Sequence, residues 1–102
     1  MKLRAITEPE DLINTVSKIV YSHLNKSDFH CFLFGSRATN TAQPASDFDF
    51  GIEGNTSVDR TTLSQIQEEL ENLHTLFHID LVDFNRVEDR FKKVAAQNRR
   101  NL

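Results

Sequence analysis

Two stretches of the chain decide its fold: Phe34-Gly35-Ser36-Arg37-Ala38 and, ten residues after the serine, Ser46-Asp47-Phe48-Asp49-Phe50. The first closes an apolar run with a Gly-Ser turn, where backbone N–H groups can hold phosphate. The second is an Asp-x-Asp step, whose two carboxylates can hold a divalent cation. Their order, across a short connection, predicts a turn and a strand that act on one ligand.

Length and composition limit what surrounds these stretches. With 102 residues, 38% of them hydrophobic and 26% charged, the chain is expected to form one soluble globular domain over residues 1–102. The net charge is −3, which argues against direct nucleic-acid binding as the main function.

The single cysteine and the termini exclude further classes. Cys31 is the sole cysteine, so an intramolecular disulfide and a cysteine-based zinc site are excluded. It lies in an apolar run, where a small buried residue is expected. The sequence has neither a membrane-spanning run nor the apolar core of a signal peptide. A cytoplasmic protein without a membrane partner is therefore predicted.

Hydrophobic periodicity predicts alternating helices and strands. Helices are expected at about 8–25, 57–73 and 86–98, and strands at 29–34, 46–53 and 77–84, with a brief helical turn and a loop over 36–46. Thr7 is the expected N-cap of the first helix, with Glu10 completing a capping box. The last helix is expected to face inward with Val87, Phe91, Val94 and Ala95.

The connections suggest how the strands pair. About a dozen residues join strands 29–34 and 46–53, which suits antiparallel pairing. The helix between strands 46–53 and 77–84 permits a right-handed parallel crossover. The predicted fold is therefore α+β, a small mixed sheet with helices packed mainly on one face.

Asp47 and Asp49 are candidate metal ligands. Residues at i and i+2 of a strand point the same way, with Cα atoms roughly 6–7 Å apart. Mg²⁺ commonly takes one or two protein carboxylates and completes its shell with water and phosphate oxygens. A solvent-facing polar strand edge would show the same alternation, so this pair alone leaves both interpretations open.

The Gly-Ser turn strengthens the ligand interpretation. Gly35 permits close backbone approach, the Ser36 hydroxyl adds a donor, and Arg37 offers a positive charge to a phosphate. An ordinary strand-to-helix turn would use the same residues. The second glycine and the lysine of a P-loop are absent from the sequence.

A third carboxylate follows in Ile79-Asp80-Leu81-Val82. The apolar neighbours of Asp80 predict a buried or central position, where a charge needs a partner or a metal. Asp83 is out of phase with Asp80 and is expected to face away or to cap the following turn. Three carboxylates beside a phosphate-binding turn are what two-metal chemistry requires.

With these residues in this order, the chain resembles the minimal nucleotidyltransferases of the DNA polymerase β superfamily over about residues 8–98. The resemblance implies transfer of a nucleoside monophosphate, from ATP or another nucleoside triphosphate, at a two-metal Mg²⁺ site. It assigns metal binding and catalysis to Asp47, Asp49 and Asp80, and phosphate binding to Gly35, Ser36 and Arg37. Asn40 stands where the family often has a second glycine.

Single-domain members of this size resemble antitoxins of HEPN/MNT toxin–antitoxin pairs, which attach AMP to a helical HEPN-domain partner. The resemblance therefore implies a protein hydroxyl as acceptor, within a homo- or hetero-oligomer. Two alternatives stay open: an antitoxin that acts by binding alone, and a transferase with a small-molecule acceptor.

Overall fold

The computed structural model describes residues 5–39, 41–43 and 45–102, without the side chains of residues 94–96. Its elements follow the predicted order, with one short strand added at the end. They are α1 (Pro9–His23), β1 (Phe29–Phe34), the 3₁₀ turn η1 (Gly35–Arg37), β2 (Phe48–Gly54), α2 (Arg60–Glu71), β3 (Ile79–Asp83), the 3₁₀ turn η2 (Phe84–Arg86), α3 (Asp89–Ala96) and β4 (Arg100–Asn101).

The strands form one mixed sheet in the order β3-β2-β1-β4. β1 pairs antiparallel with β2, and β2 pairs parallel with β3 across the α2 crossover, as the connection lengths predicted. β4 pairs antiparallel with β1 through Phe32 and Leu33. The two residues of β4 are polar, so the hydrophobic pattern of the sequence did not predict this strand.

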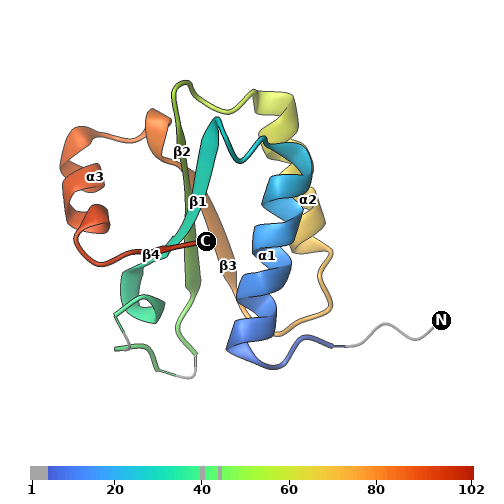
Figure 1. The fold of residues 1–102 in the computed structure, drawn as a ribbon. Coiled ribbons are helices and arrows are strands. Elements are labelled where there is room, and N and C mark those ends of the chain that lie inside the picture. Colours follow the sequence, from blue (N-terminus) through green and yellow to red (C-terminus); the bar gives the residue numbers. More distant parts are fainter. Residues whose placement is uncertain (1–4, 40, 44) are drawn as a thin grey trace.

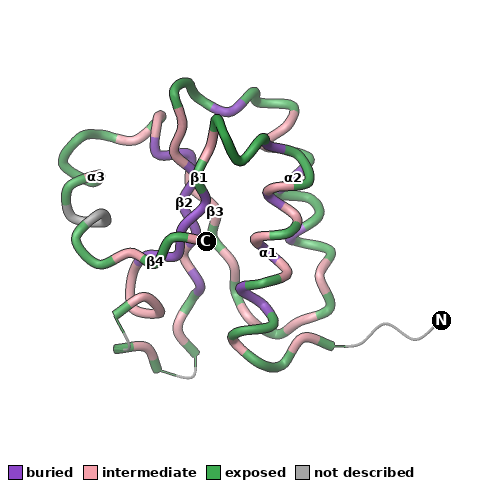
Figure 2. Tube along the Cα trace, viewed as in Figure 1, coloured by how far each residue is buried: buried purple, intermediate pink, exposed green. Residues whose placement is uncertain are grey.

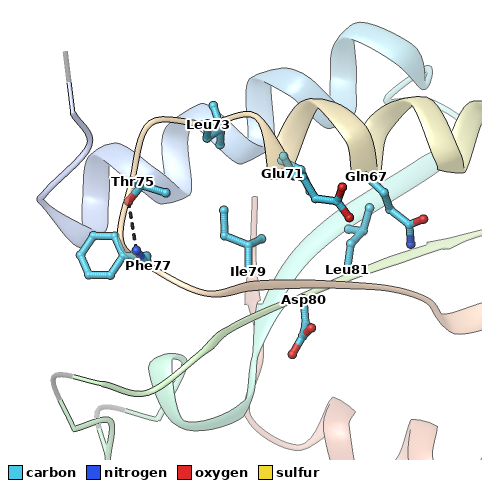
Figure 3. Close-up of a pocket in the computed structure, with 9 residues that line it drawn as sticks. Gln67, Glu71, Leu73, Thr75, Phe77, Ile79, Asp80 and Leu81 are labelled. Atoms are coloured by element: carbon cyan, nitrogen blue, oxygen red, sulfur yellow. Dashed lines mark hydrogen bonds between the residues drawn. The ribbon is translucent and has the colours of Figure 1, made fainter. Parts of the chain in front are cut away.

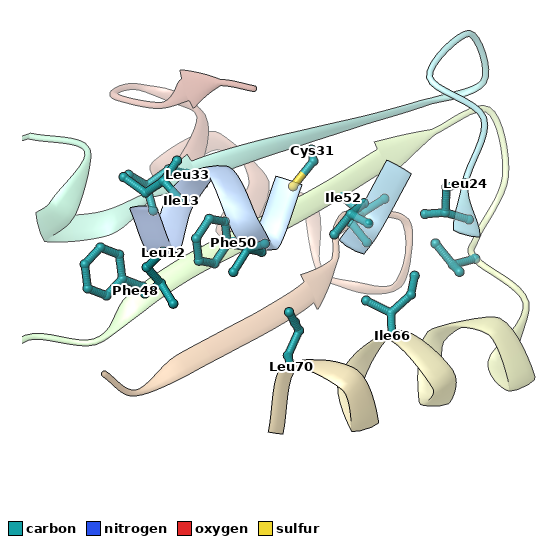
Figure 4. Close-up of a cluster of buried hydrophobic side chains, with 13 residues drawn as sticks. Leu12, Ile13, Leu24, Cys31, Leu33, Phe48, Phe50, Ile52, Ile66 and Leu70 are labelled. Carbon is teal, nitrogen blue, oxygen red and sulfur yellow. The ribbon is translucent and has the colours of Figure 1, made fainter. Parts of the chain in front are cut away.

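Helices α1 and α2 cover one face of the sheet, and α3 lies on the other (Figure 1). The main core fills the space under α1 and α2, and burial is concentrated along the strands between the layers (Figures 2 and 4). Its buried side chains are Leu12, Ile13, Val16, Val20, Leu24, Cys31, Leu33, Phe48, Phe50, Ile52, Val58, Ile66 and Leu70. The predicted α+β fold with helices mainly on one face is confirmed.

A smaller aromatic cluster occupies the α3 face. Phe32, Phe34 and Phe84 are buried there, with Val82 and Val87 packed against them. The ring of Phe91 meets those of Phe34 and Phe84 although the residue is 43% exposed. Of the last helix's predicted inward residues, the side chains of Val94 and Ala95 lie outside the described ones.

The capping prediction for the first helix was wrong. Glu8 is the N-cap, in extended backbone and without a side-chain capping bond. A residue before proline is pushed out of the helical region, so Pro9 makes Glu8 the N-cap, one residue after the predicted Thr7, and α1 begins at Pro9. None of the helices in the described part of the chain has the length and apolar content that crossing a bilayer requires.

Candidate active site

The sheet register brings two of the predicted carboxylates together. Asp49 on β2 is the partner of Asp80 on β3, and on its other side Asp49 is the partner of Phe34 on β1. Side chains of paired residues share a face of the sheet, here the face that carries α3. The end of β1 and the starts of β2 and β3 therefore meet at one point.

Gly35 follows directly after that point and lies against Asp49. Its φ is +75°, a left-handed backbone that glycine adopts without steric cost. A Cβ placed on Gly35 would lie 2.5 Å from Oδ2 of Asp49, far inside van der Waals contact. The absence of a side chain at residue 35 thus lets the turn and the carboxylate approach each other.

The electrostatics of the site are those of crowded negative charge. The pKa of Asp49 is raised above its ordinary value, first by burial and then by the neighbouring charges of Asp80 and Asp47. Asp47 is exposed immediately before β2. Asp47 and Asp80 are therefore close enough to influence Asp49 electrostatically, although β2 begins at Phe48 and not at residue 46 as expected.

The predicted burial of Asp80 was wrong. Asp80 is exposed, because β3 is an outer strand of the sheet and its residue 80 faces away from the main core. Its apolar neighbours Ile79 and Leu81 pack against the main core from the other face of the strand. The alternation of apolar and acidic residues was the available signal for a half-exposed strand.

Asp83 has the separate role that its phase predicted. It is 5% exposed and its carboxylate accepts from the amides of Val58 at 2.8 Å and Asn85 at 3.0 Å. Nε of Arg86 donates to the same carboxylate at 3.1 Å. Asp83 thus caps η2 and ties β3 to the segment before α2.

The three site carboxylates suit a hard cation by their chemistry. Asp47, Asp49 and Asp80 supply oxygen ligands, and a bound cation would offset both the burial and the neighbouring charges that raise the pKa of Asp49. Over residues 5–39, 41–43 and 45–102, no three His, Cys, Asp or Glu side chains are gathered closely enough to hold a metal ion as they stand. A cation there needs the exposed carboxylates to turn inward.

The turn after β1 has the predicted short helical form. η1 spans three residues, and the Ser36 carbonyl accepts from the Thr41 amide at 3.1 Å and from Oγ1 of Thr39 at 3.2 Å. These bonds hold the start of the loop compact beside Asp49. Asn40, at the position of the family's second glycine, lies outside the described residues.

Arg37, which the sequence suggested as a phosphate ligand, packs against aromatic side chains in the structure, and its phosphate role stays a prediction. Its guanidinium lies 4.2 Å from the ring centroid of Phe48 and 5.8 Å from that of Phe77, and it donates to the Ser46 carbonyl at 3.1 Å. Phe48 belongs to the main core, on the opposite face from Asp49. Arg37 thereby joins the two ends of the connecting loop next to Asp47.

Comparison with protein families agrees with this geometry. The family described as "Polymerase beta, Nucleotidyltransferase" matches residues 10–102. The chain belongs to this nucleotidyltransferase family. Among curated proteins, no sequence match was found.

Several solved structures with a similar fold come from toxin–antitoxin complexes. A mutant of the toxin–antitoxin MntA–HpeT is 18% identical, with a TM-score of 0.67, over 86% of this chain and 69% of that one. A toxin–antitoxin with AMP-PNP is 18% identical, with a TM-score of 0.66, over 92% and 72%. The tri-AMPylated Shewanella oneidensis HEPN toxin with MNT antitoxin gives 16% identity and a TM-score of 0.63, over 90% and 69%.

Proposed function

We propose that this protein transfers a nucleoside monophosphate, AMP from ATP, to a hydroxyl group of a partner protein. The register that sets Asp49 beside Asp80, with Gly35 against the Asp49 carboxylate, carries this proposal. Membership of the nucleotidyltransferase family supports the reaction type. The fold shared with complexes that contain AMP-PNP or an AMPylated HEPN toxin supports the nucleotide and the kind of partner.

In this proposal each residue of the site has a role that follows from its position. Asp47 and Asp49 face the triphosphate, and Asp80, on the outer strand, faces the incoming acceptor. The Ser36 hydroxyl and the amides of the turn hold the terminal phosphates, for which Gly35 leaves room. Arg37 keeps the loop closed so that Asp47 stays beside Asp49.

These residues would hold Mg²⁺, which neutralises phosphate charge and makes the acceptor hydroxyl easier to deprotonate. The acceptor oxygen attacks the α-phosphorus, the bond from that phosphorus to the bridging oxygen of the β-phosphate breaks, and pyrophosphate leaves. Such transfers depend on positioning and charge stabilisation more than on covalent chemistry by the protein. The acceptor proton passes to solvent or to a carboxylate, for which Asp80 is placed nearest.

We further propose that the partner is a helical HEPN-domain toxin, which this protein neutralises. A mass measurement tests both parts: the protein is incubated with labelled ATP, Mg²⁺ and the product of the neighbouring gene, and the product is weighed intact. We expect a mass gain of whole AMP units, lost in Asp47→Asn and in Asp49→Asn.

Glu53→Gln is the matched control, because Glu53 lies on the same strand and the same face but at the far end. It should retain transfer. If the two aspartate variants bind and neutralise the partner as well as the wild type does, the protein acts by binding alone and the transfer proposal fails.

A further inference from the structure

A groove of about 380 Å³ runs along the outer side of β3, between that strand and α2 (Figure 3). Ile79 and Leu81 point from β3 toward α2, while Asp80 points to the opposite side of the strand. The groove therefore borders the site through Asp80 but does not include Gly35, Asp47 or Asp49. An occupant would lie beside the acceptor side of the site.

β3 offers unpaired backbone to this groove. It is the outermost strand, paired with β2 among the described residues. The Phe48 amide donates to the His78 carbonyl at 2.9 Å. The backbone N–H and C=O groups of His78 and Asp80 therefore face β2. Because the N–H and C=O groups of successive residues in a strand point to opposite sides, those of Ile79 and Leu81 face outward. An exposed edge of this kind is a template for another strand.

The groove has a mainly polar surface with negative charge, among which apolar side chains are exposed. Leu70, Leu73, Phe77, Ile79 and Leu81 supply apolar surface, and Glu71 and Asp80 supply carboxylates. The described lining residues include neither lysine nor arginine. A complementary segment therefore carries apolar side chains together with at least one basic side chain.

The apolar surface continues beyond the groove. A second hollow, of about 470 Å³, shares Thr75 and Phe77 with it and is also lined by Ile6 and Leu76. Leu76 is 98% exposed. Leu76 therefore adds an exposed apolar side chain to the surface of the second hollow, next to the groove.

We propose that this groove docks the acceptor protein, through an extended, basic segment that adds to the sheet beside β3. This inference rests on the proposed function and names its docking surface. The added strand would bond to the outward peptide groups of Ile79 and Leu81, and it would bring the acceptor hydroxyl next to Asp80. A second copy of this chain fits poorly, because two-fold pairing of β3 edges would bring their acidic groove residues into one interface.

The docking surface is tested on the complex with the product of the neighbouring gene, by measuring partner affinity, ATP affinity and amide hydrogen exchange. Leu76→Ser and Glu71→Lys should each raise the dissociation constant at least tenfold in calorimetry, while ATP binding stays unchanged. Glu68→Lys is the matched control: it reverses an exposed charge on the same helix, outside the groove lining. Hydrogen exchange at the amides of Ile79 and Leu81 should slow at least tenfold when the partner binds.

The outcomes separate docking from transfer. If Leu76→Ser and Glu71→Lys both bind the partner and transfer AMP to it as the wild type does, or if the two amides exchange at unchanged rates, the docking proposal is overturned while transfer stands. Weakened partner binding by these two variants, with no AMP transfer by the wild type, supports the surface and rejects the enzymatic proposal. A wild-type dimer that Leu76→Ser dissociates, with partner binding unchanged, assigns the groove to a second copy and overturns the proposal.

Discussion

Strand β2 carries one carboxylate near each end of the same face, and the two lie in opposite electrostatic environments. At the start, Asp49 lies beside Asp80 and Asp47, and burial together with these like charges raises its pKa. At the end, Glu53 accepts a hydrogen bond from Arg99 at 2.6 Å. That bond, followed by the charges of Arg99, His30 and Lys92, lowers the pKa of Glu53.

The difference separates a carboxylate that stabilises the fold from one that costs stability. Glu53 is neutralised within the chain, and the ion pair joins β2 to the C-terminal segment. Asp49 is partly buried and lies near two other carboxylates, whose repulsion folding alone does not favour. A bound cation would relieve this repulsion. We therefore expect the functional end of β2 to be the one at Asp49, where the negative charge is not compensated within the described residues.

The largest expected effect comes from removing the charge of Asp49. Asp49→Asn should lower AMP transfer by about 1,000-fold, which corresponds to roughly 4 kcal/mol of transition-state stabilisation. Its free energy of unfolding without metal should hold or rise, because a repulsion is removed. Glu53→Gln should reverse this pattern, with transfer retained and stability reduced. Single-turnover kinetics measures the transfer rate, and urea unfolding measures the stability. If the two variants change transfer and stability in the same way, the proposed difference between Asp49 and Glu53 is wrong.

A second contrast lies on β3, between Asp83 and Asp80. Asp83→Ala should lower the free energy of unfolding by about 3 kcal/mol, because it leaves the buried Val58 amide and Nε of Arg86 without their acceptor. Asp80→Ala should change stability by at most about 0.5 kcal/mol, since Asp80 is exposed. Chemical denaturation of both variants checks this, and equal losses would show that exposure does not distinguish the two residues.

The sequence predicted the order of the helices and strands because periodicity and turn residues are local signals. It also predicted the pairing of β1, β2 and β3, since the connection lengths allow few alternatives. It missed β4, whose two polar residues owe their strand conformation to the edge of β1. The edge position of β3 depends on strand order, which no local pattern encodes, but the exposure of Asp80 could have been predicted from the alternation of apolar and acidic residues along the strand.

The site likewise has features that the sequence predicted and features that depend on the tertiary fold. The choice of Asp47, Asp49 and Asp80 came from spacing, and the register places Asp49 and Asp80 side by side. The direction of Arg37 could not be read from the sequence, because Phe48 and Phe77 reach it only through the folded sheet. The groove beside β3 likewise joins residues of α2 and β3 that have no shared motif.

Arg37→Lys sharpens the assignment of Arg37 within the site. Lysine keeps the positive charge but lacks the planar group that stacks on Phe48 and bonds Ser46. If Arg37 positions the loop, the variant should lose about tenfold in kcat and about 1 kcal/mol of stability, with KM for ATP nearly unchanged. A raised KM for ATP with full stability would instead show a direct phosphate contact. Steady-state kinetics and thermal unfolding of the same preparation distinguish the two.

The smallest effect concerns pH and the compensated end of β2. The lowered pKa of Glu53 means that the folded state binds this proton less tightly than the unfolded state, whose carboxyl titrates near 4.5. The ion pair's contribution, about 0.5 kcal/mol for a partly exposed pair, is therefore complete above that pH and is lost as pH falls through the lowered pKa. Urea unfolding from pH 7 to about pH 3 should show wild type and Glu53→Gln converging at the acid end. A difference that stays constant across this range would mean that the Glu53 charge contributes nothing, and that packing of Arg99 over Phe32 holds the C-terminal segment instead.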